Sequence, residues 1–295
     1  IDSVGIVTAR AGINMSGGQF LVGTGVTIGV AGIATFRSGR IDVGDSLYNT
    51  SIGQGAGDAH TTGDDNTAVG YGALTENTTG HSNTGVGYNA LDACTTGVAN
   101  VAVGKDALGA LTTGEKNVAV GRLSGAAITD AEDNVALGQQ TLHGTTTGDR
   151  NIAIGTRALY TPTTVSDNIA VGYQALTANT TGTQNIAVGS NSLDANTTGA
   201  DNVAVGYNAL TANTTGARNT AFGSGALVTA TTANNNNAFG YQALTANTTG
   251  ASNNAFGKSA LDANTTGGQN TAMGHNTLGA NTTASNNTGI GYQVL

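Results

Sequence analysis

The chain has 295 residues, of which 46 are Gly, one is Pro, one is Cys and none is Trp. Charged residues make up 9% of it, whereas an ordinary globular domain has about 25%. The formal net charge of -8 argues against a nucleic-acid-binding protein, which needs a basic surface, and no apolar run is long enough to span a bilayer. A composition so poor in large apolar and charged residues is often disordered, unless its pattern indicates otherwise.

Residues 1–48 are Gly-rich and contain short β-branched pieces at 4–8, 25–29 and 32–36. Short apolar runs broken by Gly predict β structure of a fibrous kind. Because apolar and polar residues alternate too little in this segment to bury a core within one chain, we expect it to intertwine with sister chains. It is predicted to be a separate N-terminal unit.

Residues 49–295 form an array of 17-residue units. An Asn begins each unit, and fourteen steps of 17 residues lead from Asn49 to Asn287 without an insertion or deletion. A Gly follows four residues after each of these Asn residues, and the last of the 15 units is incomplete. Disordered tracts do not need such fixed spacing. The period predicts an all-β fold, a parallel β-roll or β-solenoid in which each unit is one turn. Because the last unit is cut short, we expect the sequence to be part of a longer or processed chain.

Unit positions are counted here from the recurring Asn as position 1. We expect the Asn side chains to stack into a hydrogen-bonded ladder along the coil; a ligand site is the alternative interpretation of this row. The Gly at position 5 is predicted to form a corner with positive φ. The predicted ladder is represented by Asn66, Asn100, Asn151, Asn202 and Asn253.

Position 3 is mostly Ala and position 4 is bulky and apolar. Consecutive strand residues point to opposite faces, so Ala is predicted to fill a thin interior where only Ala fits. The bulky row then needs a partner outside the coil. The simplest partner is the same chain, and a homotrimer would bury the row from three sides. The predicted row includes Val69, Val103, Ile154, Val205 and Phe239.

Positions 8 and 9, a small residue and usually Leu, are interpreted as a second strand. Leu is replaced there only by Gly57 and Gly125. Positions 13 to 15, mostly Thr-Thr-Gly, are predicted to be an exposed turn, and positions 16 and 17 a solvated margin. Cys94, at position 12, is interpreted as a loop residue; as the only Cys, it can form no disulfide within the chain.

Position 6 varies in class, which is typical of a surface row. Exposed Tyr on a β surface usually reflects strand compatibility alone. The alternative is a stacking platform for sugars that faces a receptor. The tyrosines of this row are Tyr71, Tyr88, Tyr173, Tyr207 and Tyr241, with Tyr292 in the last unit.

No set of residues predicts catalysis, and we expect no cofactor and no metal. The densest acidic spots, at 64–65 and 130–133, are candidates for calcium, but no calcium-roll nonapeptide recurs. The repeated Asn-Thr-Thr matches the glycosylation pattern without indicating modification. The rows of Thr-Thr also suggest ice binding. Against this interpretation, adjacent Thr residues of a strand face opposite ways, so they would not form one flat surface.

At its Asn-x-Ala-Val-Gly and Ala-Leu-x-Ala positions, the array resembles the head repeats of trimeric autotransporter adhesins of the YadA-like family. That resemblance covers residues 49–295 and implies a left-handed parallel β-roll that assembles as a trimer. The family's units are shorter, so the Thr-Thr-Gly segment looks like an extension of one corner.

Units such as Asn66–Gly80 are also similar to those in tail-fibre proteins of marine bacteriophages, and residues 2–13 are similar to segments of cyanophage structural proteins. This resemblance implies a structural shaft or adhesin of a virion appendage. Its partners would be sister chains, other virion or fibre proteins, and a host cell-surface glycan or protein. The alternative is a bacterial cell-surface adhesin or extracellular filament. A glycan-cutting tailspike enzyme is disfavoured because acidic residues do not recur at matching turns.

Overall fold

The computed structural model describes residues 47–162 and 164–295, so all but the last two residues of the predicted segment 1–48 lie outside the described part. The described residues contain no helix, and their 15 strands form one sheet in chain order. Each strand has three residues. The strands are β1 (Thr50–Ile52), β2 (Thr67–Val69), β3 (Thr84–Val86), β4 (Val101–Val103), β5 (Val118–Val120), β6 (Val135–Leu137), β7 (Ile152–Ile154), β8 (Ile169–Val171), β9 (Ile186–Val188), β10 (Val203–Val205), β11 (Thr220–Phe222), β12 (Asn237–Phe239), β13 (Asn254–Phe256), β14 (Thr271–Met273) and β15 (Thr288–Ile290).

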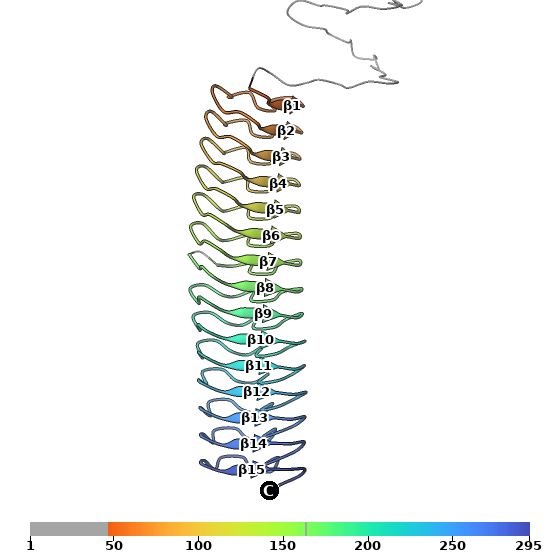
Figure 1. Ribbon diagram of the computed structural model, residues 1–295, viewed down its shortest axis with the longest axis vertical. Coiled ribbons are helices and arrows are strands. Elements are labelled where there is room, and N and C mark those ends of the chain that lie inside the picture. The colour runs from red at the N-terminus through yellow and green to blue at the C-terminus, as the bar shows by residue number, and fades with distance from the viewer. Residues whose placement is uncertain (1–46, 163) are drawn as a thin grey trace, which may run out of the picture. The chain divides into compact units, whose positions relative to one another are not determined.

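All neighbouring strands are parallel, and each residue pairs with the residue 17 positions further on. Ala204 lies beside Ala221, for example, and Val205 lies beside Phe222. The strands stack on one side of residues 47–295, and long loops return the chain to the next turn (Figure 1). The predicted parallel β-solenoid of 17-residue turns is therefore confirmed.

The strand positions alternate between the interior and the surface. In β10, Ala204 is fully buried, whereas Val203 and Val205 on either side of it are partly exposed. The Ala row points inward, into the core. The bulky row at position 4 points outward, in the direction expected from the sequence.

A Gly closes each strand because the chain turns sharply there. The φ angle of the position-5 glycines lies between 117° and 142°. A Cβ on Gly206 would lie 2.7 Å from the carbonyl carbon of Gly223 in the next turn. Both the backbone conformation and the close stacking of turns therefore exclude a side chain at this corner.

Positions 8 and 9 do not form the second strand predicted from the sequence. From Leu74 to Leu278, each Leu of position 9 lies in the left-handed region, as at Leu210, where φ is 54°. Such a residue bends the chain and cannot extend a strand. The two units without Leu have Gly57 and Gly125, with φ of 64° and 59°, so the exceptions obey the same backbone requirement.

The expectation of an interior that accepts only Ala is also wrong. From Leu74 to Leu261, the Leu side chains of position 9, such as Leu176 and Leu210, are fully buried. Position 12 forms a further, mostly buried row with Asn at half of the turns and Leu111 or Ile128 at two others. Bending the chain at Leu costs about 1–2 kcal/mol per residue, which burial of the side chain offsets with about 1.5–3 kcal/mol.

The Asn residues of position 1 form a continuous buried ladder. The backbone N–H of Asn219 donates to Oδ1 of Asn202 at 3.0 Å, and Nδ2 of Asn202 donates to the carbonyl oxygen of Gly216 at 2.8 Å. The same arrangement recurs at Asn66, Asn100, Asn151 and Asn253, all at most 1% exposed. The side chains thus join each turn to the next and also close the turn itself.

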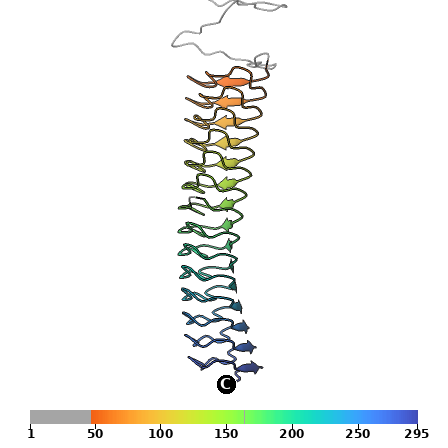
Figure 2. The same ribbon diagram turned by 90° about the vertical axis from the view of Figure 1, so that its left-hand side faces the viewer.

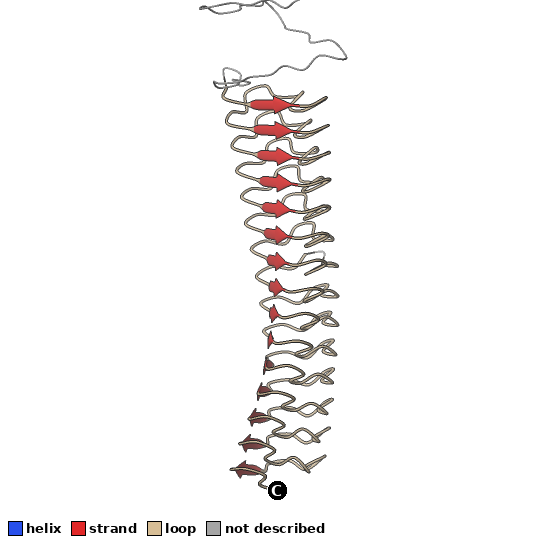
Figure 3. Cartoon of the chain, turned by 90° about the vertical axis from the view of Figure 1, so that its right-hand side faces the viewer, coloured by secondary structure: helices blue, strands red, loops and turns tan. Residues whose placement is uncertain are grey.

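The stack of strands twists along its length. In Figure 2 the arrows near β1 and those near β15 point to opposite sides of the view, and those between them turn gradually. Figure 3 shows the same rotation, with the loops remaining on the side away from the strands. The outer face of the sheet therefore winds around the solenoid.

Candidate functional site: an uncharged strip and a side groove

The outward-facing residues of positions 2 and 4 form two parallel rows along the sheet, here called the apolar strip because position 4 is apolar in every strand, while position 2 is Thr or Asn in eight of the 15. Its 30 side chains, two from each of β1–β15, include no ionisable group. The position-4 members predicted from the sequence, Val69, Val103, Ile154, Val205 and Phe239, all lie on this face. The sequence did not reveal the second row, because position 2 varies between apolar Val or Ile and polar Thr or Asn.

Several members of the strip are strongly exposed in the single chain. Phe222 is 52% exposed and Met273 is 46% exposed. Along position 4 the aromatic rings stack on each other: the ring centroids of Phe222 and Phe239 lie 6.2 Å apart, and those of Phe239 and Phe256 lie 5.0 Å apart. Large exposed apolar patches on a soluble chain usually mark an interaction surface.

The Tyr row of position 6 lies at the surface, next to the strip. Tyr71 and Tyr88 stack with their ring centroids 5.2 Å apart and an interplanar angle of 12°. The ammonium group of Lys105 lies 5.0 Å from the ring centroid of Tyr88. The other tyrosines of the row, Tyr173, Tyr207 and Tyr241, are also exposed. They do not stack on one another, because a turn with Ser190 or Ser224 separates them.

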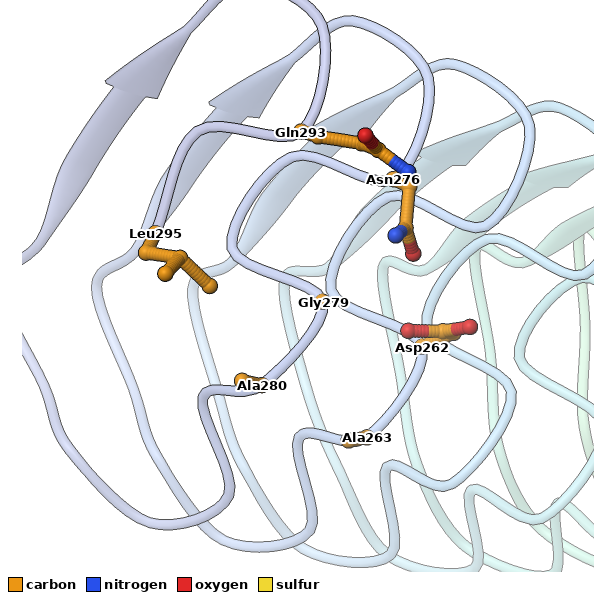
Figure 4. Close-up of a pocket in the computed structure, with 7 residues that line it drawn as sticks. All are labelled: Asp262, Ala263, Asn276, Gly279, Ala280, Gln293 and Leu295. Carbon is orange, nitrogen blue, oxygen red and sulfur yellow. The ribbon is translucent and has the colours of Figure 1, made fainter.

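Three separate cavities open at residues of positions 6, 7, 10 and 11, and this side of the solenoid is here called the side groove. The cavities have volumes of about 520, 260 and 630 Å³. The first is lined by Tyr71, Asn89 and Asp92, among others, and the second by Tyr207 and Tyr241. The third is shown in Figure 4, where Asp262, Asn276 and Gln293 lie on neighbouring turns of the same side.

Two carboxyl groups in position 10 are partly desolvated. Burial raises the pKa of Asp92, and the carboxylates of Asp106 and Glu76 raise it further. Burial likewise raises the pKa of Asp194, whose Oδ1 is buried without a hydrogen-bond partner in the described structure. The groove thus combines aromatic faces with amide and carboxyl groups, which together can contact the apolar face and the hydroxyl groups of a sugar.

The structure adds burial to two further interpretations, those of Cys94 at position 12 and of the Thr-Thr-Gly segment that follows this position. Cys94 is a loop residue, as interpreted from the sequence, but its side chain belongs to the core: it is fully buried, and burial raises the pKa of its thiol to about 11. The Thr-Thr-Gly segment is only partly exposed, since Thr215 faces solvent and Gly216 is buried. The presence of Leu111 and Ile128 at position 12 was the sequence signal that this row is internal.

The Asn residues of the Asn-Thr-Thr tripeptides are mostly buried, and their amide nitrogens are occupied by hydrogen bonds. Nδ2 of Asn213 donates to Oδ1 of Asn196 at 2.9 Å and to the carbonyl oxygen of Gly216 at 3.0 Å. A glycosylated amide has no room in that row. The matches to the glycosylation pattern therefore follow from a second structural ladder.

Among residues 47–162 and 164–295, no three His, Cys, Asp or Glu side chains cluster in a way that could hold a metal ion. Within the same ranges, no helical segment has the length and apolar character needed to cross a membrane. The acidic spots at 64–65 and 130–133 accordingly form no such cluster. No family model, curated protein or solved structure gives a significant match to this chain.

Proposed function

We propose that this chain is the shaft of a homotrimeric fibre, such as a bacteriophage tail fibre or a related virion appendage, whose sides contact a host cell. Its work is mechanical and adhesive, and it needs no cofactor. The observation that carries the proposal is the apolar strip: a solenoid exposes 30 uncharged side chains in two continuous rows. Depletion of charge in an exposed apolar face is typical of the core of a protein interface.

The size of the strip supports association between copies. At about 4.8 Å per turn, 15 turns give a length of about 70 Å. Two rows about 7 Å apart, with the breadth of their side chains, make the strip about 10 Å wide. The resulting area of about 700 Å² is close to the roughly 800 Å² that each partner buries in a stable interface. Three strips that face a common axis would remove this area from water.

The side groove and its tyrosines would remain on the outside of such an assembly. Tyr71 and Tyr207 are about half exposed, so each offers only part of its side chain to a host glycan or protein. A single contact of this kind would be weak. Repetition along the shaft, across three chains and across several fibres multiplies weak contacts into firm attachment.

Two substitutions, at positions two residues apart in the chain, test which of these surfaces forms the interface between copies. Val205→Asp places a charge in the strip and is expected to reduce association at least tenfold, because an unpaired carboxylate is costly to bury. Tyr207→Ala lies in the groove and is expected to leave association unchanged while weakening attachment to host cells. Sedimentation velocity measures association, and a binding assay on host cells measures attachment.

Unmodified chains that sediment as monomers at neutral pH would contradict the proposal. Equal loss of the assembled species in both variants would contradict the assignment of the strip as the interface. Unchanged host-cell attachment by Tyr207→Ala in an assembled fibre would leave the shaft in place but remove this part of the groove from the attachment surface.

A further inference from the structure

The side groove changes its charge along the solenoid. In the turns of β1–β3, positions 6, 7, 10 and 11 carry no Lys or Arg and three carboxyl groups, those of Asp58, Glu76 and Asp92. In the turns of β4–β7, the same positions carry one carboxyl group, that of Asp106, and three cations, those of Lys105, Arg122 and Arg157. These three cations are here called the basic patch. It is a local basic surface on a chain whose net charge is -8.

The two Arg residues of the basic patch have no carboxylate partner in the described part of the chain. Arg150, at position 17, shows the contrast, since its Nε donates to a carboxylate oxygen of Asp167 at 2.7 Å. Nε of Arg157 donates only to Oε1 of Gln140, at 3.3 Å, which leaves its other N–H donors without an acidic partner. Arg122 and Arg157 are both exposed. Their guanidinium groups are therefore accessible to an anion from outside the chain.

Two cations of the basic patch lie directly beside each other. Lys105 and Arg122 occupy position 6 of successive turns, about 4.8 Å apart along the axis, and no other two successive turns have Lys or Arg there. The carboxylate of Asp106 lies 3.8 Å from Nζ of Lys105 and is the one acidic group near the pair. Like charges on neighbouring turns repel each other. An anion bound between them would replace this repulsion with attraction.

Aromatic rings flank the basic patch at both ends. Nζ of Lys105 lies 5.0 Å from the ring centroid of Tyr88, and Cζ of Arg157 lies 5.5 Å from that of Tyr160. The ring of His143 stacks on Tyr160 with the centroids 5.2 Å apart. Burial lowers the pKa of His143, so its ring is mostly uncharged at pH 7 and extends the aromatic surface. Three turns, or about 14 Å, separate the two ends, which is room for several sugar rings.

The surroundings of the basic patch limit the kind of anion that fits. Positions 16 and 17 of the same turns carry five Asp or Glu and two Lys or Arg, so the opposite margin of the strip repels anions. In the turns of β8–β12, positions 6 and 7 are only Tyr, Ser, Asn, Gln or Gly, and Asp194 is the one carboxyl group at positions 10 and 11. This neutral continuation suits a chain of sugars that is charged in part. It does not suit a nucleic acid, which has a charge at every unit.

We propose that the basic patch binds a negatively charged polysaccharide, whose carboxylate, sulfate or phosphate groups pair with Lys105, Arg122 and Arg157 while its sugar rings contact Tyr88 and Tyr160. Guanidinium groups present paired N–H donors that match the oxygen atoms of such groups. This inference rests on the attachment role proposed above for the side groove and names the class of its ligand.

Titration calorimetry with the full chain tests the preference for anionic sugars. The probes are oligogalacturonate, which carries carboxylates, and dextran sulfate, which carries sulfate esters, with unsubstituted dextran as the neutral probe. The chain is expected to bind an anionic probe at least about tenfold more tightly than dextran, and added salt should weaken that binding. The tighter of the two anionic probes identifies the preferred group. Equal binding of all three probes would overturn the inference.

A pair of double variants locates the binding. Arg122→Gln with Arg157→Gln removes two cations of the patch and should weaken binding of the anionic probe at least about tenfold. Gln already occupies positions 6 and 7 in the turn of β6, so it is compatible with both sites. The control, Arg218→Gln with Lys258→Gln, removes the same charge from other turns and should change the affinity less than about threefold. An equal loss in both would show a general effect of net charge and contradict a site at the patch.

Two further measurements separate this inference from the others. If the patch variant loses the assembled species in sedimentation, its Arg residues lie between copies, and the inference is overturned while the proposed fibre stands. Tighter binding of single-stranded DNA than of either anionic polysaccharide would overturn it as well. A monomeric chain that still prefers the anionic probes would remove the fibre but support the inference, because the whole patch lies on one chain.

Discussion

Gly206 illustrates, at the scale of single residues, why the corner after each strand accepts no side chain. Its φ of 135° disfavours other residues, and the next turn approaches its Cα closely enough to exclude a Cβ. Gly225 provides a contrast at position 7: its φ is 66°, and an added Cβ would meet only Cγ of Gln242 at 3.5 Å. Asn208 already occupies the equivalent place with a φ of 52°.

Gly206→Ala is therefore expected to lower the free energy of unfolding by about 2–4 kcal/mol, through backbone strain and displacement of the next turn. Gly225→Asn, the control, should change it by less than about 1 kcal/mol, because Asn tolerates the left-handed region. Urea unfolding followed by circular dichroism measures both. Similar losses in the two variants would contradict the special role of the corner.

Cys94 gives the stability a defined dependence on pH. The ordinary pKa of the thiol is 9.0, and burial raises it to about 11 in the folded chain. Below pH 9 the thiol is protonated in both states and its contribution is intact. As the pH rises from 9 to 11, the unfolded thiol loses its proton first, so the folded state loses stability, by up to about 2–3 kcal/mol.

The matched control is Cys94→Ala, in which this loss should be absent. The free energies of unfolding of the two proteins should therefore diverge above pH 9, with the unmodified chain falling faster. Parallel curves for the two proteins up to pH 11 would show that the thiol is not protected by burial.

At the scale of the turn, the buried Asn side chains hold the loop in place, a role that was expected of a second strand. Asn202 accepts from the N–H of Asn219 and donates to Oδ1 of Asn185 at 3.1 Å and to Gly216 O. One side chain thus links three successive turns. A strand of three residues could not hold so long a loop in place alone.

Asn202→Ala should destabilise the chain by about 2–5 kcal/mol, because it leaves buried donors and acceptors without partners. Asn237→Thr removes an Asn from the exposed row instead, and Thr220 shows that Thr fits there, so a change below about 0.5 kcal/mol is expected. Denaturant unfolding of both variants measures the difference. If the two cost the same, the ladder would not be a principal source of stability.

Much of the turn could be predicted because it depends on features that leave a periodic record. The invariant spacing gave the solenoid, the alternation of Ala204 and Val205 gave the two faces, and the Gly and Asn rows gave the corner and the ladder. The conformation of Leu210 could not be predicted in this way, because an apolar residue in the left-handed region has the same pattern as a strand residue. Here the tertiary burial of Leu overrides its backbone preference.

The apolar strip was only half predicted, for a related reason. Position 2 holds Val203 in one turn and Asn237 in another. A row of mixed polarity does not show whether it faces the interior or the surface. Position 12 was missed because Asn residues such as Asn213 usually indicate a surface turn. In the structure, stacking pairs their amides with each other, so that a polar row becomes an internal one.

At the scale of the whole solenoid, stability is a sum of similar turns and of the contacts between neighbouring turns. Each turn of the described array contacts mainly the one before it and the one after it. The fold therefore has no unique centre, and the number of turns is not fixed by packing. The length of each turn, in contrast, is fixed by the ladders and the corner.

Removal of residues 202–218, one whole unit, should consequently leave a folded chain with a far-ultraviolet circular dichroism signal reduced in proportion. Removal of residues 202–219 takes one residue more, the ladder residue Asn219, and should open the junction to a protease. Limited proteolysis with mass spectrometry locates the cut. A protease-resistant junction in the longer deletion would mean that the turns tolerate a change of length.

The winding of the sheet face, seen from β1 to β15, has a mechanical consequence (Figure 2). Rods that remain joined along a spiralling seam must wrap around one another, as the yarns of a rope do. A pull along such a rope is partly converted into a sideways squeeze on the seam. In the proposed fibre, the chains would therefore be pressed together more firmly under load, without any added crosslink.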